Sequence, residues 1–332
     1  MSFFAVLLAL VIEQLRPLPQ GTPLHEALVN WARWTARNFD AGREHHAWVV
    51  WCVAVLVPTT LVGLVYGAFF HFSLMLALAF DLCVLYACLG FRQFSHFYTD
   101  IRDALDRGRE DEAREALRQW RHLDASELPR EELLRHVIEH ALLAAHRHVF
   151  GVFFWFVLGS ALGLGPVGAV LYRMAEFCAR HWGRTNPALA APTHEGLALR
   201  AQRAFDLIDH VPARLTAAGF AVVGNFEESV GCWRQHASLW PHSNDGILLA
   251  AAAGATGIAL GGQPAPDVGP ASAFEGSRFE AAANALHEES TASTPGAAPQ
   301  LGHLRSVVGL VWRSVVLWML LLALLSLANL LG

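Results

Sequence analysis

The chain contains no lysine, and charged residues of every kind are scarce. All 24 basic residues are arginine, and charged residues make up only 16% of the 332 residues. The missing lysine excludes a P-loop lysine, a Schiff-base lysine and a Ser-Lys dyad. A soluble domain carries about 25% charged residues, so this chain has too few to cover a solvated surface. The formal net charge of −5, without a basic stripe of interleaved aromatic residues, predicts that nucleic acid is not a partner.

Cysteine is also sparse and follows no pattern. The five cysteines include no CxxC pair, and four of them lie in or beside apolar segments. A free cysteine in such a place behaves as a small hydrophobic residue. The sequence therefore predicts neither a disulfide framework nor a zinc-thiolate site, and it assigns no metal ligand.

Long apolar runs take the place of the missing charges. Residues 47–70, 72–91 and 307–331 each contain at most one charged residue. Each run reaches the roughly 20 residues that cross a ~30 Å hydrocarbon layer. Residues 2–15 form a shorter apolar run without a cleavage site, and we expect a retained first membrane helix there. The sequence therefore predicts an all-α integral membrane protein with several spans.

Arginines and a break in the apolar pattern predict the topology. Residues 92–148 contain ten arginines, so the positive-inside rule makes them a cytoplasmic helical insertion of an inner-membrane protein. Glycines and a proline at residues 163–166 interrupt the next apolar stretch, which is either a broken or re-entrant hairpin or a plain kinked span. The five arginines of residues 173–205 favour the hairpin, since a span would carry them out of the cytoplasm. We therefore expect a helical bundle with short, broken or re-entrant helices.

Composition divides the chain into five consecutive regions. The second alternates charges at helical spacing, which is typical of a solvated face, and we assign no chemistry to it. The fourth is rich in Ala, Gly, Pro and Ser, which predicts a loop. In order, the regions are N-terminal membrane helices (1–91), a cytoplasmic helical region (92–148), a semi-apolar core with a candidate ligand pocket (149–262), a flexible loop (263–302) and a C-terminal transmembrane anchor (303–332).

Two short polar islands stand out in the semi-apolar core. Residues 209–217 read DHVPARLTA, and residues 242–246 read HSNDG and lead into a segment rich in Ala and Gly. Burying Asp, Arg and Asn beside apolar segments is costly unless they face a partner, a cavity or a ligand. The small residues after the second island let a backbone or a flat ligand approach closely. The islands therefore predict a ligand site.

Both islands also have a purely structural interpretation. In it, Asp209 and Arg214 form a buried ion pair. Ser243 and Asn244 then cap a helix that begins at Gly246. The residues alone do not decide between this interpretation and a ligand site.

The islands resemble two sequence blocks of the CobD/CbiB membrane proteins of cobalamin biosynthesis, which share a superfamily with the AmpE signalling proteins. The first family block, DD-x-x-N-x-x-PARLTA, is matched at Asp209 and at residues 212–217. The second is SPNAG-x-x-x-AA-x-AG-x-x-x-x-LGG. Its matches here are Ser243, Asn244, Gly246, Ala250, Ala251, Gly254 and residues 260–262. The likeness extends over most of the chain.

The resemblance implies an activity. Family members join a corrinoid carboxylate, that of adenosylcobyrate, to aminopropanol phosphate through an amide bond, which requires an anion site and a base. The candidate residues are Glu139 and Asp209 as bases and Arg214, Ser243, Asn244 and Gly246 as substrate ligands. The chain has no nucleotide-binding motif, so the use of ATP and Mg²⁺ stays open. The expected partners are the lipid bilayer and the corrinoid, and the oligomeric state is not indicated.

Departures from the family pattern support a second interpretation. Where the family has Glu-Asn this chain has Glu139-His140, and it lacks the Asp that precedes the Gly corresponding to Gly151. A following family block, Asn-Thr-Leu-Asp-Ser-Met, is also absent. These losses weaken a metal-nucleotide or amine-activating site, and AmpE-like members lack much of the same set. The alternative function is therefore that of a non-enzymatic, AmpE-like membrane signalling or scaffold protein.

A minor alternative comes from residues 136–140, which match the H-x-x-E-H motif of inverted zinc proteases. On a helix, His136 and His140 lie one turn apart, and Glu139 would act as the base with a later Glu as third ligand. The chain has 17 histidines, several of them close together, so a chance match is easy. The resemblance offers the better account of Glu139.

Overall fold

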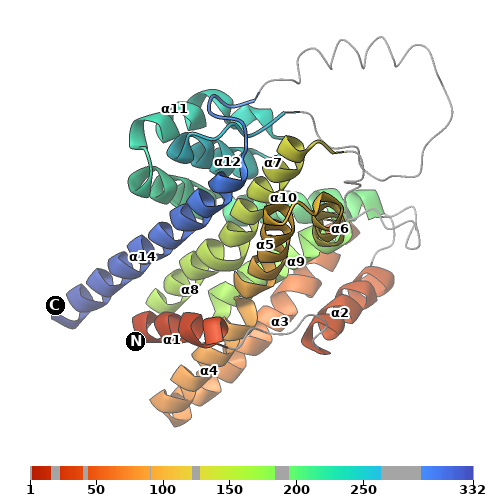
Figure 1. Cartoon of the computed structure of the whole chain (residues 1–332). Coiled ribbons are helices and arrows are strands. Elements are labelled where there is room, and N and C mark those ends of the chain that lie inside the picture. Colours follow the sequence, from red (N-terminus) through yellow and green to blue (C-terminus); the bar gives the residue numbers. More distant parts are fainter. Residues whose placement is uncertain are drawn as a thin grey trace. The chain divides into compact units, whose positions relative to one another are not determined.

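The molecule is described by a computed structural model that covers residues 2–15, 23–39, 44–89, 91–121, 128–183, 194–262 and 293–331. Within these residues every regular element is a helix, and the β contacts are two isolated bridges (Figure 1). The predicted all-α fold is confirmed. Most of the expected flexible loop, residues 263–292, lies outside the described part of the chain.

Apolar helices of membrane-crossing length confirm that this is a membrane protein. In the described part of the chain, three stretches qualify by length and composition, namely 46–72, 130–161 and 301–328. The first and last coincide with two of the predicted runs. The predicted run at 72–91 instead forms a shorter apolar helix of 15 residues, α4 (Leu74–Cys88), which ends before Leu89.

The stretch 130–161 was not predicted as a single element. It runs without a break through α7 (Arg130–Ala145), a π-helical turn η1 (His146–Phe150) and α8 (Gly151–Ala161). The first turns of this stretch contain charged residues and belong to the region predicted to be cytoplasmic. For this reason the apolar character of the whole stretch was not recognised in the sequence. The π turn therefore lies in the middle of a continuous helical rod.

The chain divides into two compact units that interleave along the sequence. Unit 1 comprises residues 1–93, 145–212 and 318–332, and unit 2 comprises residues 94–144 and 213–317. The chain passes from one unit into the other within four helices, namely α5 (Phe91–Asp106), α7, α10 (His194–Val223) and α14 (Leu301–Leu331). The five consecutive regions expected from composition stay a prediction.

Unit 1 is built from packed helices. Helix α3 packs against α2, α4 and α9, while α1 lies on α4. The long helix α3 has no ionisable residue between residues 47 and 70 apart from Cys52 and Tyr66, and it contains Pro58 without ending there. The complete helices of this unit are α1 (Ser2–Leu15), α2 (Pro23–Phe39), α3 (Glu44–Phe72), α4, α8 and α9 (Val167–Gly183).

The predicted break at residues 163–166 is the turn of a tight hairpin between α8 and α9. Gly163 and Gly165 adopt left-handed backbone conformations, with φ of 76° and 58°, which glycine reaches without strain. A Cβ atom on Gly168 would lie 2.0 Å from the carbonyl oxygen of Trp155. Only glycine therefore allows the two helices to approach this closely.

Unit 2 contains the small-residue segment that follows the second polar island. Its helices include most of α5 (Phe91–Asp106), α6 (Glu110–Arg121), α7, α11 (Phe226–His236), the short 3-10 turn η3 (Ala237–Leu239) and α12 (Ser243–Thr256). A Cβ on Gly254 of α12 would lie 2.3 Å from the carbonyl oxygen of Glu228, so α11 and α12 pack with their backbones in contact. The hydroxyl of Tyr98 donates to the Leu304 carbonyl across 2.6 Å and ties α5 to α14.

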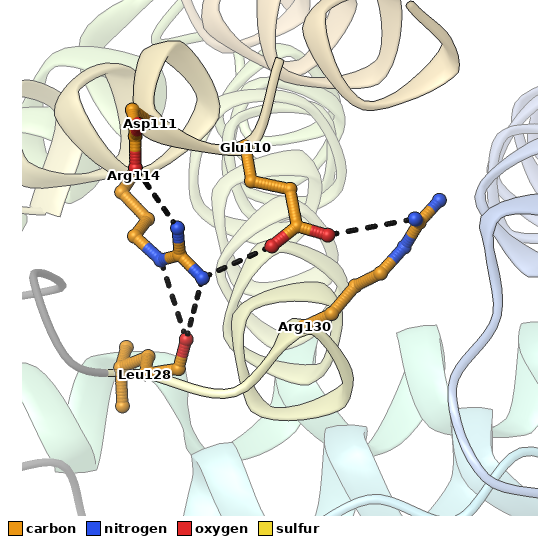
Figure 2. A network of polar contacts seen from close by, with 5 residues as sticks. All are labelled: Glu110, Asp111, Arg114, Leu128 and Arg130. Carbon is orange, nitrogen blue, oxygen red and sulfur yellow. Dashed lines mark hydrogen bonds and ion pairs between the residues drawn. The ribbon is translucent and has the colours of Figure 1, made fainter. Parts of the chain in front are cut away.

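The charged face of unit 2 holds a network of ion pairs centred on Arg114. Its guanidinium donates to Glu110 and Asp111, both at 3.1 Å, and to the Leu128 carbonyl at 3.4 Å (Figure 2). Arg130 reaches Glu110 from the start of α7 at 3.5 Å. Exposed pairs of this kind contribute about 0–1 kcal/mol each. The network steadies the surface and offers no chemistry.

Candidate functional site

The six candidate residues divide between the two units. Asp209 belongs to unit 1, whereas Glu139, Arg214, Ser243, Asn244 and Gly246 belong to unit 2. Asp209 and Arg214 share helix α10, on either side of Pro212. The structure therefore gives two local arrangements.

Asp209 is the acceptor at the centre of a buried polar group in unit 1. Its side chain is 2% exposed, and its Oδ1 atom lies 2.8 Å from Nε2 of His146, whose side chain is fully buried. The hydroxyl of Tyr172 donates to the same oxygen across 2.8 Å. Nearby, the indole N–H of Trp155 donates to the carbonyl of Ile208 at 3.2 Å. The predicted base is thus held by two side chains from other helices.

His146, which contacts Asp209, begins the π turn. A π turn inserts one residue into a helix and changes the direction of the side chains that follow, and such turns are frequent at functional sites. His146 begins this turn and is fully buried in the middle of the apolar stretch 130–161. Sequence reasoning missed both His146 and Tyr172. An ionisable residue in the middle of an apolar helix is the signal that could have found the histidine.

Arg214 meets the second polar island inside unit 2. One of its Nη atoms donates to Oδ1 of Asn244 across 3.3 Å. Asn244 is 5% exposed, whereas Arg214 is half-buried, and the neighbouring Ala213 and Ala217 are fully buried. The PARLTA block thus places small residues into the core and keeps one guanidinium at its edge. The pairing brings the two polar islands together.

The start of α12 rules out one structural interpretation. The helix begins at Ser243, and His242 is the N-cap residue without a side-chain cap. Ser243 and Asn244 therefore lie in the first turn, and the expectation that they cap a helix beginning at Gly246 is wrong. A Cβ on Gly246 would lie 2.0 Å from the carbonyl oxygen of Ala237, so this glycine is required for packing.

Glu139 forms a hydrogen bond to the Leu-Gly-Gly turn (residues 260–262) that ends the second block. Its Oε1 atom accepts a hydrogen bond from the backbone N–H of Gly261 at 2.9 Å, and Arg135 donates to the Gly261 carbonyl at 2.5 Å. Gly261 and Gly262 have φ of 84° and 117°, values that favour glycine. On the far side of the turn, Leu260 and Thr294 exchange two hydrogen bonds of 2.8 Å. One turn of α7 therefore binds both the N–H and the carbonyl of Gly261.

The H-x-x-E-H motif is used for packing. The ring of His140 lies edge-on against Trp120, with centroids 4.5 Å apart, and His136 is buried. Glu139 is engaged with Gly261. Across the residues whose positions are described, no group of three His, Cys, Asp or Glu side chains is placed to hold a metal ion.

Comparison with known proteins gives a consistent result over nearly the full length. The family model described as CobD/Cbib protein matches residues 2–271. The cobalamin biosynthesis protein CobD of Stutzerimonas stutzeri (strain A1501) is 31% identical over 329 residues, which is 96% of each chain. The protein of the same name from Chromobacterium violaceum is 35% identical over 188 residues, 57% of each chain. No solved structure matches.

Proposed function

The chain belongs to the CobD/CbiB protein family, and on this premise we propose that it acts in cobalamin biosynthesis by joining a corrinoid carboxylate to aminopropanol phosphate through an amide bond. The observation that carries the proposal is the extent of the family match. It includes both polar islands and Glu139. The similarity to the family is therefore not confined to the two short blocks but extends over most of the chain.

Amide formation sets three chemical requirements. The amine must lose a proton to a base before its nitrogen attacks the carbonyl carbon. The C–N bond then forms as the bond between that carbon and a leaving oxygen breaks, so the carboxylate must first be activated. Donors must stabilise the oxyanion that develops and bind the anionic groups of the substrates. ATP with Mg²⁺ is the activating co-reactant to test.

In this proposal Arg214 and Asn244 contact a substrate. A guanidinium presents a planar fork of donors that matches a carboxylate or a phosphate. Arg214 is half-buried, so its fork is partly desolvated but accessible, and Asn244 fixes it from the first turn of α12. Ser243 is exposed in the same turn, where the positive end of the helix favours an anion. Gly246 serves the packing of α12.

Glu139 and Asp209 take positioning roles in the same proposal. Each carboxylate already accepts hydrogen bonds from groups inside its own unit. A buried carboxylate held in this way orients its donors more readily than it takes a proton from a substrate. Glu139 sets the shape of the Leu-Gly-Gly turn, and Asp209 orients His146 and Tyr172.

The proposed location is the inner membrane, with the arginine-rich residues 92–148 on the cytoplasmic side. The substrate would then be a corrinoid accessible from the cytoplasm. A reporter fused at Gly108, in the exposed turn between α5 and α6, tests this. Green fluorescence from a fused fluorescent protein is expected, and activity of a fused periplasmic phosphatase would contradict it.

Complementation tests the proposed function. A cobinamide-requiring strain that lacks its amide synthase should be rescued by the wild-type protein and not by the Arg214→Ala variant. Arg234→Ala, at an exposed arginine of α11, is the matched control and should rescue. Absence of rescue despite normal membrane insertion of the wild type would contradict the proposal and support an AmpE-like signalling role.

A further inference from the structure

A cavity lies in unit 2 where the last turn of α12 meets the first turn of α11, two helices that pack against each other (Figure 1). Its volume is about 320 Å³, near the lower end of the roughly 300–1,000 Å³ of ligand pockets. The lining residues come from three parts of the chain, all of them in unit 2. They include Asn225, Glu228 and Cys232 from α11 and its cap, Thr256 and Gly257 from the end of α12, and Gly296.

Backbone contacts hold the walls of the cavity in place. The N–H of Asn225 donates to the Ala255 carbonyl at 3.3 Å, which joins the start of α11 to the end of α12. Gly257 ends α12 with φ of 69°, and its carbonyl accepts from the N–H of Ala297 at 2.9 Å. A Cβ atom on Gly257 would meet no atom within 4 Å, so the backbone there borders open space.

Glu228 gives the cavity its charge. Among the described residues that line the cavity, Glu228 is the only charged one and none is basic. Its side chain is exposed and forms no hydrogen bond or ion pair within the part of the chain that the structure describes. Burial and the nearby Glu228 carboxylate raise the pKa of the Cys232 thiol, so that thiol is neutral. The α11 side of the cavity therefore carries one negative charge.

The end of α12 adds a second source of negative potential. The last turn of a helix presents carbonyl groups without helical partners, and the helix dipole gives that end a partial negative charge. Gly254, Thr256 and Gly257 bring this end to the cavity. The hydroxyl of Thr256 donates to the Ala252 carbonyl at 2.7 Å, so its oxygen is left as an acceptor.

The start of α11 also borders the cavity, and its positive pole is compensated locally. Asn225 is the N-cap residue, and its side-chain oxygen accepts from the N–H of Glu228 at 3.3 Å. Glu227 and Glu228 lie in the first turn and carry charge of the sign that this pole favours. The cavity as a whole therefore favours a cation over an anion.

We propose that this cavity binds a protonated primary amine, with Glu228 as its counter-charge and Thr256 as a hydrogen-bond acceptor. A primary ammonium group has three N–H donors, which suit a carboxylate, a hydroxyl oxygen and the carbonyls of a helix end. Its single positive charge balances the single carboxylate. The amine comes either from aminopropanol phosphate, in which case the inference rests on the proposed function, or from an ethanolamine lipid headgroup.

Calorimetric titration of the full-length protein in detergent tests the site. The probes are aminopropanol phosphate, aminopropanol and propanediol, in which a neutral hydroxyl replaces the ammonium. Glu228→Gln should weaken binding of both amines at least fivefold and Thr256→Val at least threefold, while propanediol binds too weakly to measure. Glu227→Gln is the matched control, at an exposed glutamate of the same turn that does not line the cavity, and should leave binding within twofold.

A lipid arm identifies the source of the amine. Wild-type and variant proteins are placed in nanodiscs of phosphatidylcholine with or without phosphatidylethanolamine, and retained lipid is counted by native mass spectrometry. Phosphatidylcholine is the matched lipid, since its quaternary ammonium has no N–H donor. Retention of phosphatidylethanolamine by wild type and its loss in Glu228→Gln, without binding of aminopropanol phosphate, supports the site with a lipid as its ligand. Equal binding of every amine probe by folded wild type and Glu228→Gln overturns the inference.

The two proposals fail separately. If wild type complements the synthase mutant but Glu228→Gln and Thr256→Val leave the KM for aminopropanol phosphate unchanged, the amine site is refuted for the substrate and the enzymatic function stands. If wild type does not complement but binds amines in a way that depends on Glu228, the function is refuted and the site stands. Thr256→Val keeps the charge of the cavity, so its effect separates a hydrogen bond inside the cavity from a general attraction of cations by Glu228.

Discussion

Asp209 and His146 lie 63 positions apart in the sequence, and their side chains meet at 2.8 Å with both almost wholly buried. Tyr172 donates to the same carboxylate oxygen from a third helix. A single carboxylate thus ties η1, α9 and α10 together inside unit 1. Because all three side chains are enclosed, the contact acts on the stability of the unit as well as on the shape of any site near it.

Asp209→Ala should destabilise the protein by about 1–3 kcal/mol, because it removes the acceptor from two buried donors. Thermal unfolding in detergent, followed by intrinsic fluorescence, measures the change. Asp206→Ala removes a half-buried carboxylate one turn earlier on α10 and should cost less. Equal losses of thermal stability in the two variants would show that the hydrogen bonds to Asp209 contribute no more to stability than the contacts of Asp206.

Two substitutions of Glu139 distinguish a positioning role from a role as general base. In Glu139→Gln the amide oxygen can still accept the Gly261 N–H, so complementation should persist, whereas Glu139→Ala should lose it. A general base cannot be replaced by an amide. Loss of rescue in Glu139→Gln at normal expression would therefore return Glu139 to a catalytic role.

Gly246→Ala should destabilise the protein by about 1–3 kcal/mol, because the added methyl group overlaps the backbone of η3. Gly231→Ala on α11 is the matched control, since its Cβ would meet no atom within 4 Å. That change should be neutral or should stabilise the helix by up to about 1 kcal/mol. Thermal unfolding of both variants checks the pair, and similar melting temperatures would contradict the close packing.

The buried carboxylate of Glu176 forms ion pairs with Arg173 at 2.9 Å and with Arg180 at 3.4 Å. These ion pairs predict a specific dependence of stability on pH. The folded-state pKa of about 2 lies below the usual 4.5, so the unfolded state binds the proton first as pH falls. Stability from Glu176 is therefore complete above about pH 4.5 and is lost between there and about pH 2. Between pH 6 and pH 3, wild type should lose more thermal stability than Glu176→Gln. Parallel losses would contradict the ion pairs.

The sequence predicted those features that depend on local pattern. Two of the apolar runs are membrane-length helices, and the glycines at 163–166 do end one helix and start the next. The polar islands were recognised because charge is rare in their surroundings, and Arg214 does meet Asn244. In each of these cases a short stretch of residues carries the information.

Features that depend on distant pairing could not be read in this way. Nothing near Asp209 in the sequence specifies His146 or Tyr172 as its partners. A π turn has no sequence signature as clear as a proline kink, so the inward direction of His146 was not predictable. The contact of Glu139 with Gly261 spans 122 positions and depends on a left-handed turn. This contact is the reason for proposing a positioning role for Glu139.

The central claim is that this protein makes the amide bond of the cobinamide side chain. Purified wild-type protein is incubated with adenosylcobyrate and aminopropanol phosphate, with and without ATP and Mg²⁺, and the product is identified by mass spectrometry. The account predicts a product lighter than the sum of the two substrates by one water, strongly reduced in Arg214→Ala and unchanged in Arg234→Ala. Absence of this product from folded wild-type protein under every condition would contradict it.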